Sequence, residues 1–148
     1  MPDRLSADWP GGATRHLGLR LLPGEDLRGA LSAAFAKAPE AAGYLATCVG
    51  SLDGARIRPA GRDDALEISG NLEIVALSGT FSADGPHLHI AVADSEGRVL
   101  GGHLLAGCAV RTTAEVVIGL VSGVRFLREA DARTGYAELF MVRNDGQD

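Results

Sequence analysis

The chain has few aromatic residues and no surplus of positive charge. Aromatic side chains make up 5% of its 148 residues, and 14 Lys and Arg are outnumbered by 19 Asp and Glu, which leaves a net charge of −5. A protein that binds DNA chiefly through phosphates shows a basic patch or a basic excess. This composition therefore argues against nucleic acid as a partner.

Cysteine is scarce, and long apolar runs are absent. Cys48 and Cys108 form no CxxC pair and lie in apolar contexts, so we expect small core residues in a reducing, cytoplasmic setting. No apolar run approaches the roughly 20 residues that span a bilayer. The N-terminus has acids and the run Trp9-Pro10-Gly11-Gly12 rather than a basic segment before an apolar block, so it does not resemble a secretory signal.

What the chain does contain indicates one α+β domain. An apolar fraction of 46% is ordinary for a globular protein of this size. Residues 1–13 are expected to form a flexible leader, 14–143 the domain and 144–148 a tail. Apolar residues at helical spacing predict one main N-terminal helix over 25–37, and the pattern after it has period two, which predicts a mostly antiparallel sheet.

The expected strands follow from this alternation, from β-branched residues and from the glycines between them. Residues 136–142 are expected to close the sheet. The predicted strands cover 15–22, 44–52 with a continuation over 55–59, 64–70, 72–81, 87–94, 99–110, 113–120 and 136–142. The segment 113–120 could also form a short helix, but its β-branched residues favour a strand.

Three of the four histidines, His87, His89 and His103, fall within seventeen residues. His87 and His89 project to the same face of a strand. Gly97 suits the left-handed position of a three-residue hairpin loop, and if Asp94 pairs with Arg98, counting back places His89 opposite His103. Directly opposed side chains have Cβ atoms about 4.5–5.5 Å apart, so the three imidazoles are expected to converge.

Three imidazoles suit zinc with a fourth position open to water or substrate. The alternative is a solvated polar strand face. Gly101 and Gly102 leave room for something to approach the backbone before His103. Glu115 is a candidate fourth ligand or general base, or else an exposed strand carboxylate. His16 lies on a distant predicted strand, and we expect it at the surface.

Several segments in order resemble the PPC domain, found in plants and prokaryotes. The resemblance covers about residues 15–142 and is carried by 19–27 (LRLLPGEDL), 72–82 (LEIVALSGTFS), 85–91, 97–104 (GRVLGGHL), 107–117 and 126–140. It implies an α+β fold with a largely antiparallel sheet, a homotrimer and a fold similar to that of acetolactate decarboxylase, a zinc lyase. Prokaryotic members are commonly described as proposed DNA-binding proteins, and the three histidines match the bacterial pattern.

These observations leave three functions open. The first is a homotrimeric binding or regulatory module with a metal, in which the apolar strands 74–77 and 116–121 supply core or subunit contacts. The second is a zinc lyase or hydrolase acting on a small oxo or carboxylate compound, with Glu115 moving the proton and Arg20 or Arg111 holding the carboxylate. The third is a DNA binder, although 56–59 (RIRP) lacks the central glycine of an AT-hook.

Overall fold

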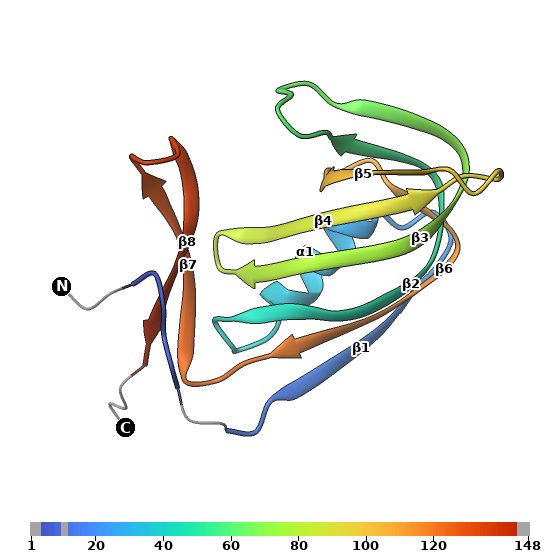
Figure 1. The fold of residues 1–148 in the computed structure, drawn as a ribbon. Coiled ribbons are helices and arrows are strands. Elements are labelled where there is room, and N and C mark those ends of the chain that lie inside the picture. The colour runs from blue at the N-terminus through green and yellow to red at the C-terminus, as the bar shows by residue number, and fades with distance from the viewer. Residues whose placement is uncertain (1–3, 10–11, 145–148) are drawn as a thin grey trace.

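The computed structural model describes residues 4–9 and 12–144, and residues 1–3, 10–11 and 145–148 lie outside the described part. It confirms the α+β class, with one helix and a mostly antiparallel set of strands (Figure 1). The elements are β1 (Arg15–Leu21), α1 (Leu27–Ala36), β2 (Gly43–Arg58), β3 (Leu66–Ser82), β4 (Gly85–Ala93), β5 (Val99–Leu104), β6 (Ala109–Leu120), β7 (Val124–Asp131) and β8 (Tyr136–Arg143).

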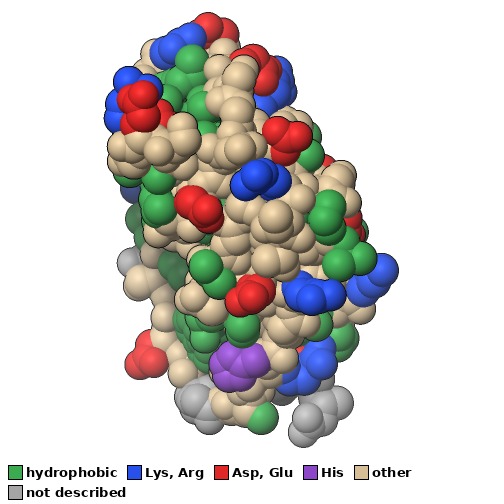
Figure 2. Space-filling view, turned by 90° about the vertical axis from the view of Figure 1, so that its right-hand side faces the viewer, with side chains coloured by type: hydrophobic (Ala, Val, Ile, Leu, Met, Phe, Trp, Pro, Cys, Tyr) green, Lys and Arg blue, Asp and Glu red, His purple; other side chains and the backbone are tan. Residues whose placement is uncertain are grey.

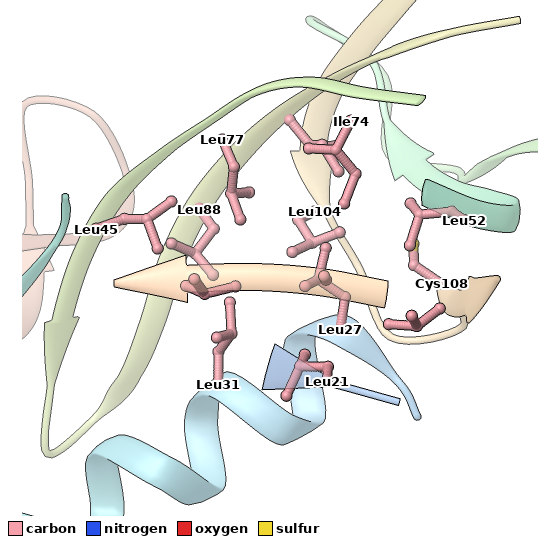
Figure 3. Packing of buried hydrophobic residues seen from close by; sticks show 14 of the residues in the cluster. Leu21, Leu27, Leu31, Leu45, Leu52, Ile74, Leu77, Leu88, Leu104 and Cys108 are labelled. Atoms are coloured by element: carbon pink, nitrogen blue, oxygen red, sulfur yellow. The ribbon is translucent and has the colours of Figure 1, made fainter. Parts of the chain in front are cut away.

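Helix α1 begins at a side-chain cap and buries one face. The Asp26 carboxylate accepts a hydrogen bond from the Gly29 N–H, 2.9 Å away, which satisfies a donor that the first helical turn leaves free. Leu27, Leu31 and Phe35 recur at helical spacing and are buried. They pack against strand residues such as Leu88 and Leu104 in the main core, which the sheet wraps around (Figures 1 and 3).

The main sheet has the order β1-β6-β2-β3-β4-β5, with a further pairing between β2 and β5. That pairing sets Ile57 opposite Leu104 and Arg58 opposite His103. Strands β2, β3, β4 and β5 therefore close into a ring, because the long β2 pairs with β3 on one side and reaches β5 at its far end. The closure brings the end of β2 beside the predicted histidine hairpin.

The β4–β5 hairpin has the predicted register. His89 pairs with His103, the Asp94 N–H donates to the Arg98 carbonyl at 2.9 Å, and Gly97 has a φ of 77°. The left-handed conformation at Gly97 carries little steric cost without a Cβ. Turn chemistry therefore sets which histidines face each other.

Three strand predictions need correction. The predicted strands 64–70 and 72–81 are one strand, β3, which continues through Gly70 with a φ of 99°. The predicted strand 99–110 stops at Leu104, and the one predicted over 113–120 starts earlier, at Ala109. The chain leaves the sheet between them because the N–H groups of Gly107 and Cys108 donate to the Asp26 carboxylate rather than to a strand.

The prediction that 136–142 closes the main sheet is wrong. Strand β8 pairs only with β7, and the two form a separate hairpin, which stands apart from the main sheet in Figure 1. Its contacts explain this placement: Val124 and Phe126 pack with Ala42 in a second small core, and the Phe126 N–H donates to the Ala41 carbonyl.

Part of the predicted leader contacts this hairpin. The Arg4 guanidinium binds the Glu129 carboxylate at 2.6 and 2.9 Å, and the Met141 N–H donates to the Arg4 carbonyl at 2.9 Å. Trp9 packs against the second core. The leader's flexibility and the proposed boundaries 1–13, 14–143 and 144–148 stay predictions, and residues 1–3, 10–11 and 145–148 lie outside the described residues.

Both cysteines are free thiols, Cys108 buried and Cys48 partly so. Burial raises the pKa of the Cys48 thiol to about 11, so it is protonated at neutral pH. Within the described part of the chain, no helix has the length and apolar character needed to cross a bilayer.

Candidate metal centre

Strands β4 and β5 bring His87, His89 and His103 together. The ring centroids lie 5.1 Å apart for His87 and His89, 4.7 Å for His87 and His103, and 5.0 Å for His89 and His103. One nitrogen of each ring lies within 4.8 Å of those of the other two. The buried neighbours Leu88 and Ile90 face the core, so the alternation of β4 sends the histidines to the opposite face.

The donor set fits zinc. Tetrahedral zinc with Zn–N bonds of about 2.0–2.1 Å requires nitrogens about 3.4 Å apart, and one ring nitrogen of each histidine already lies within 4.8 Å of the other two. Among the described residues, no Cys, Asp or Glu joins the cluster. Three neutral imidazoles would thus hold the ion and leave a fourth position for water or a ligand.

His87 and His103 line a cleft of about 550 Å³, and His89 lies beside them outside its lining. Its walls come from four segments: the β2–β3 connection, the β3–β4 turn, the β5 end and the β7–β8 hairpin. Its lining residues are Arg58, Gly61, Arg62, Asp63, Asp84, Gly85, Pro86, His87, His103, Arg128, Tyr136, Ala137 and Glu138. A cleft of this size accommodates a small molecule beside the imidazoles.

Two arginines, Arg58 and Arg128, flank the cluster. Arg58 lies directly opposite His103 in the β2–β5 pairing. The guanidinium of Arg128 donates to the Thr80 hydroxyl at 3.0 Å, and Thr80 lies opposite His87 in the β3–β4 pairing. Neither arginine was predicted as a site residue from the sequence. Arg58 reaches the site only through ring closure, and Arg128 only because the C-terminal hairpin packs against this face.

The surroundings of the cluster favour neutral imidazole. Burial, followed by the charge of Arg58, lowers the pKa of His103 to about 4. Burial, followed by the charge of Arg128, also lowers the pKa of His87 below its ordinary value. Only the neutral ring offers a free nitrogen to a metal, so both side chains are ready to bind one at neutral pH.

The structure does not bring the other predicted site residues to this cluster. Glu115 on β6 pairs with Arg20 on β1, and both line a separate shallow depression with Val49. Arg111 is exposed on β6, and His16 is exposed on β1 opposite Gly119. None of these four residues lines the histidine cleft, so within one chain the roles foreseen for Glu115, Arg20 and Arg111 stay predictions.

The space left by Gly101 and Gly102 is taken by backbone rather than by a ligand. A Cβ at Gly102 would lie 2.6 Å from the Arg58 carbonyl oxygen, and one at Gly101 would lie 2.7 Å from that of Ile90. Glycine is therefore needed for β5 to lie between β2 and β4 (Figure 1).

The structure offers little support for DNA contacts. The segment 56–59 lies at the end of β2 and continues just past it, with Ile57 buried, so it cannot enter a minor groove as an extended hook. Figure 2 shows acidic and basic side chains interspersed on one face of the molecule, without a continuous basic patch.

Fold and site together define a small α+β domain whose antiparallel sheet presents three imidazoles in an open cleft. The model of the family described as the Plants and Prokaryotes Conserved (PCC) domain matches residues 10–122. The chain belongs to this family, which confirms the resemblance to the PPC domain. The match ends before β7, and the likeness to acetolactate decarboxylase stays a prediction.

Relatives extend the likeness over most of the chain. A bifunctional protein GlmU of Synechococcus sp. (strain JA-3-3Ab) is 47% identical over 134 residues, which are 90% of this chain and 22% of that protein. A GlmU of Synechococcus sp. (strain JA-2-3B'a(2-13)) is 44% identical over 88% of this chain and 21% of its own length. The chain thus spans about a fifth of the curated relatives it matches.

Solved structures share the fold. A hypothetical protein of Salmonella has a TM-score of 0.86 and 39% identity, with coverage of 90% of this chain and 97% of that one. The metal-containing protein AF0104 of Archaeoglobus fulgidus has a TM-score of 0.77 and 26% identity, covering 90% and 98%. A proposed DNA-binding protein of Bacteroides thetaiotaomicron has a TM-score of 0.74 and 21% identity, covering 86% and 95%.

Proposed function

We propose that this PPC domain is a homotrimeric binding or regulatory module that holds one zinc ion per chain through His87, His89 and His103. The observation that carries the proposal is the convergence of three imidazoles at the wall of an open cleft. The metal content of the Archaeoglobus fulgidus relative supports it. Bound zinc would polarise a ligand oxygen or lower the pKa of a water molecule.

Exposed apolar side chains on the main sheet support self-association. The strand segments 74–77 and 116–121 are chiefly core, with Ile74 and Val116 buried. Their neighbours Val75 and Val49 are instead 54% and 58% exposed. Apolar side chains on a regular strand surface are suited to subunit contacts. Light scattering on the purified protein should give the mass of three chains, and a monomer would exclude the trimer.

Metal analysis of untagged protein tests the zinc centre. We expect one zinc per chain and a loss of at least about tenfold in affinity for His103→Ala, since zinc sites depend on each ligand. The matched control is His16→Ala, which alters an exposed histidine outside the cluster and should retain the metal. A wild-type protein without stoichiometric zinc, or a His103→Ala variant that retains it, would refute the centre.

The cleft favours a second candidate, a zinc-dependent lyase or hydrolase acting on a small oxo or carboxylate compound. Tyr136 and Glu138 line the cleft beside the histidines, and a carboxylate there is better placed than Glu115 to move a proton. A screen of such compounds with zinc-loaded protein should give turnover that Glu138→Gln reduces at least about tenfold. Unchanged turnover in this variant would exclude Glu138 as the group that transfers the proton.

DNA association is a third candidate, supported by the description of a Bacteroides thetaiotaomicron protein of similar fold. A salt titration with duplex DNA decides it. Binding through phosphates weakens steeply as the salt concentration increases. Absence of binding at low salt would exclude DNA as a partner, and a small ligand would remain the only candidate.

A further inference from the structure

The histidine cleft holds two guanidinium groups that form no ion pair among the described residues. Arg58 and Arg128 are half-buried. Their guanidinium groups donate to neutral oxygens: Arg58 to the Arg62 carbonyl at 3.4 Å, and Arg128 to the Thr80 hydroxyl at 3.0 Å. Among the ion pairs of the described residues, neither arginine takes part.

The acids of the cleft accept hydrogen bonds from other groups or are exposed to solvent. Asp84 accepts the backbone N–H of Arg128 at 2.8 Å, and Glu138 accepts the Thr134 hydroxyl at 2.8 Å. Asp63 is exposed. The third arginine of the cleft, Arg62, is already paired with Asp64 at 2.7 Å. The charges of Glu138 and Asp84 favour the charged form of Arg128 from nearby. Among the described residues, however, no acid forms an ion pair with Arg58 or Arg128, so both guanidinium groups keep N–H donors for a ligand.

A half-buried charge without a counter-charge is costly, because it has lost part of its hydration. Burial lowers the pKa of the Arg128 guanidinium below its ordinary value, and the nearby charges of Glu138 and Asp84, which act to raise it, offset this only in part. Zinc on three neutral imidazoles would add positive charge between the two arginines. A bound anion would compensate all three charges at once.

We propose that Arg58 and Arg128 form an anion subsite beside the three histidines, and that the cleft takes a small oxoanion such as a carboxylate or phosphate. The two arginines lie on opposite sides of the cluster, Arg58 beside His103 and Arg128 beside His87 through Thr80. Planar guanidinium groups bind carboxylate and phosphate oxygens in pairs. This subsite deepens the proposed function and rests on the zinc centre for its added charge.

The test is calorimetric titration of zinc-loaded protein with pyruvate, with its uncharged amide pyruvamide, and with inorganic phosphate. We expect pyruvate or phosphate to bind, and pyruvamide to bind at least about tenfold more weakly than pyruvate, because a charge-assisted hydrogen bond contributes about that much. Comparing pyruvate with phosphate distinguishes a carboxylate site from a phosphate site.

Substitutions assign the binding to the two arginines. Arg58→Gln and Arg128→Gln should each weaken the binding of the preferred anion about tenfold while zinc content stays that of the wild type. The matched control is Arg125→Gln, an exposed arginine on β7 three residues from Arg128 and outside the cleft. Arg58→Gln keeps the test valid if Arg128→Gln unfolds through loss of its Thr80 contact.

Failure of the subsite is distinguishable from failure of the zinc centre. If zinc binds but neither anion binds at millimolar concentration, or both variants bind like the wild type, the subsite is refuted while the metal centre stands. If zinc does not bind, the same titration on metal-free protein tests the arginines alone. Arginine-dependent binding there retains the subsite, and no binding refutes it.

Discussion

His89 lies directly opposite His103 across the β4–β5 ladder, with ring centroids 5.0 Å apart. The pairing depends on the turn that joins the two strands, because a one-residue slip would send His103 to the core face of the sheet. Both the hairpin turn and the packing of β5 between its neighbours are therefore requirements for the metal centre.

The first prediction concerns the turn. The Asp94 carboxylate accepts the N–H groups of Glu96 and Arg98 at 2.9 Å each. Asp94→Ala should lower the free energy of unfolding and weaken zinc binding, because the register is held less firmly. Urea unfolding and zinc titration measure both effects. Glu73→Ala, at an exposed acid on β3 outside the histidine cleft, is the control, and equal behaviour of the two variants would contradict this role.

The second prediction concerns the close approach of β5 and β2. In Gly102→Ala the new methyl group would lie 2.6 Å from the Arg58 carbonyl oxygen, so the strands must separate. We expect a loss of about 1–3 kcal/mol in stability and weaker zinc binding by the adjacent His103. Gly18→Ala on β1 meets no atom within 4 Å and should change stability by less than about 0.5 kcal/mol. A Gly102→Ala protein as stable as Gly18→Ala would show that β5 does not need glycine there.

The third prediction concerns Asp26, which joins the helix to the loop between β5 and β6. Its carboxylate accepts the N–H groups of Gly29, Gly107 and Cys108 at 2.8–2.9 Å. Asp26→Ala leaves these three N–H groups without that acceptor. Thermal unfolding should therefore show that the free energy of unfolding is lower by about 2 kcal/mol or more. Asp53→Ala on β2 is an exposed control. If both variants unfold at the same temperature, the carboxylate does not fasten this loop.

The fourth prediction concerns pH in the metal-free protein. The pKa of His103 is about 4 in the folded chain and about 6.5 in the unfolded chain. The unfolded state therefore binds the proton first, so stability is full above pH 6.5 and decreases as the pH falls towards 4. Urea unfolding with a chelator present should show this decrease.

A difference between variants isolates the contribution of His103. Between pH 6.5 and 4, the free energy of unfolding should decrease less in His103→Gln than in the wild type. In His16→Gln it should decrease as much as in the wild type. Identical pH profiles for wild type and His103→Gln would contradict the assigned electrostatics. Acidic groups such as Asp131, whose pKa is lowered to about 2 by its hydrogen bond with Arg133, lose their contribution at lower pH.

Much of the site was predictable because its determinants are local. The two-residue period of a strand places His87 and His89 on one face. The turn at Asp94 and Gly97 sets the register of the hairpin, and that register places His103 opposite His89. Helix α1 was equally predictable from the sequence, since the spacing of its apolar residues and the acid at Asp26 are short-range signals.

The errors fall where distant segments meet. Nothing local shows that strand 99–110 must break, because the break depends on the Asp26 carboxylate, which lies 81 positions from Gly107. Alternation in 136–142 indicates a strand but not its partner, and the strand pairs with β7 rather than with the main sheet. Glu115 was chosen for its nearness in sequence to His103 and Arg20 for its charge, and the two lie together elsewhere on the sheet.

The sequence by itself determined the fold class and the facing register of the three histidines, because alternation and turn chemistry act over a few residues. Its motifs, taken in order, also indicated the family. Only the tertiary structure decided that Arg58 and Arg128 flank those histidines and that a cleft opens beside them. Arg58 arrives through the β2–β5 pairing and Arg128 through packing of the C-terminal hairpin. Contacts of that kind depend on the burial of whole segments, which no short pattern encodes.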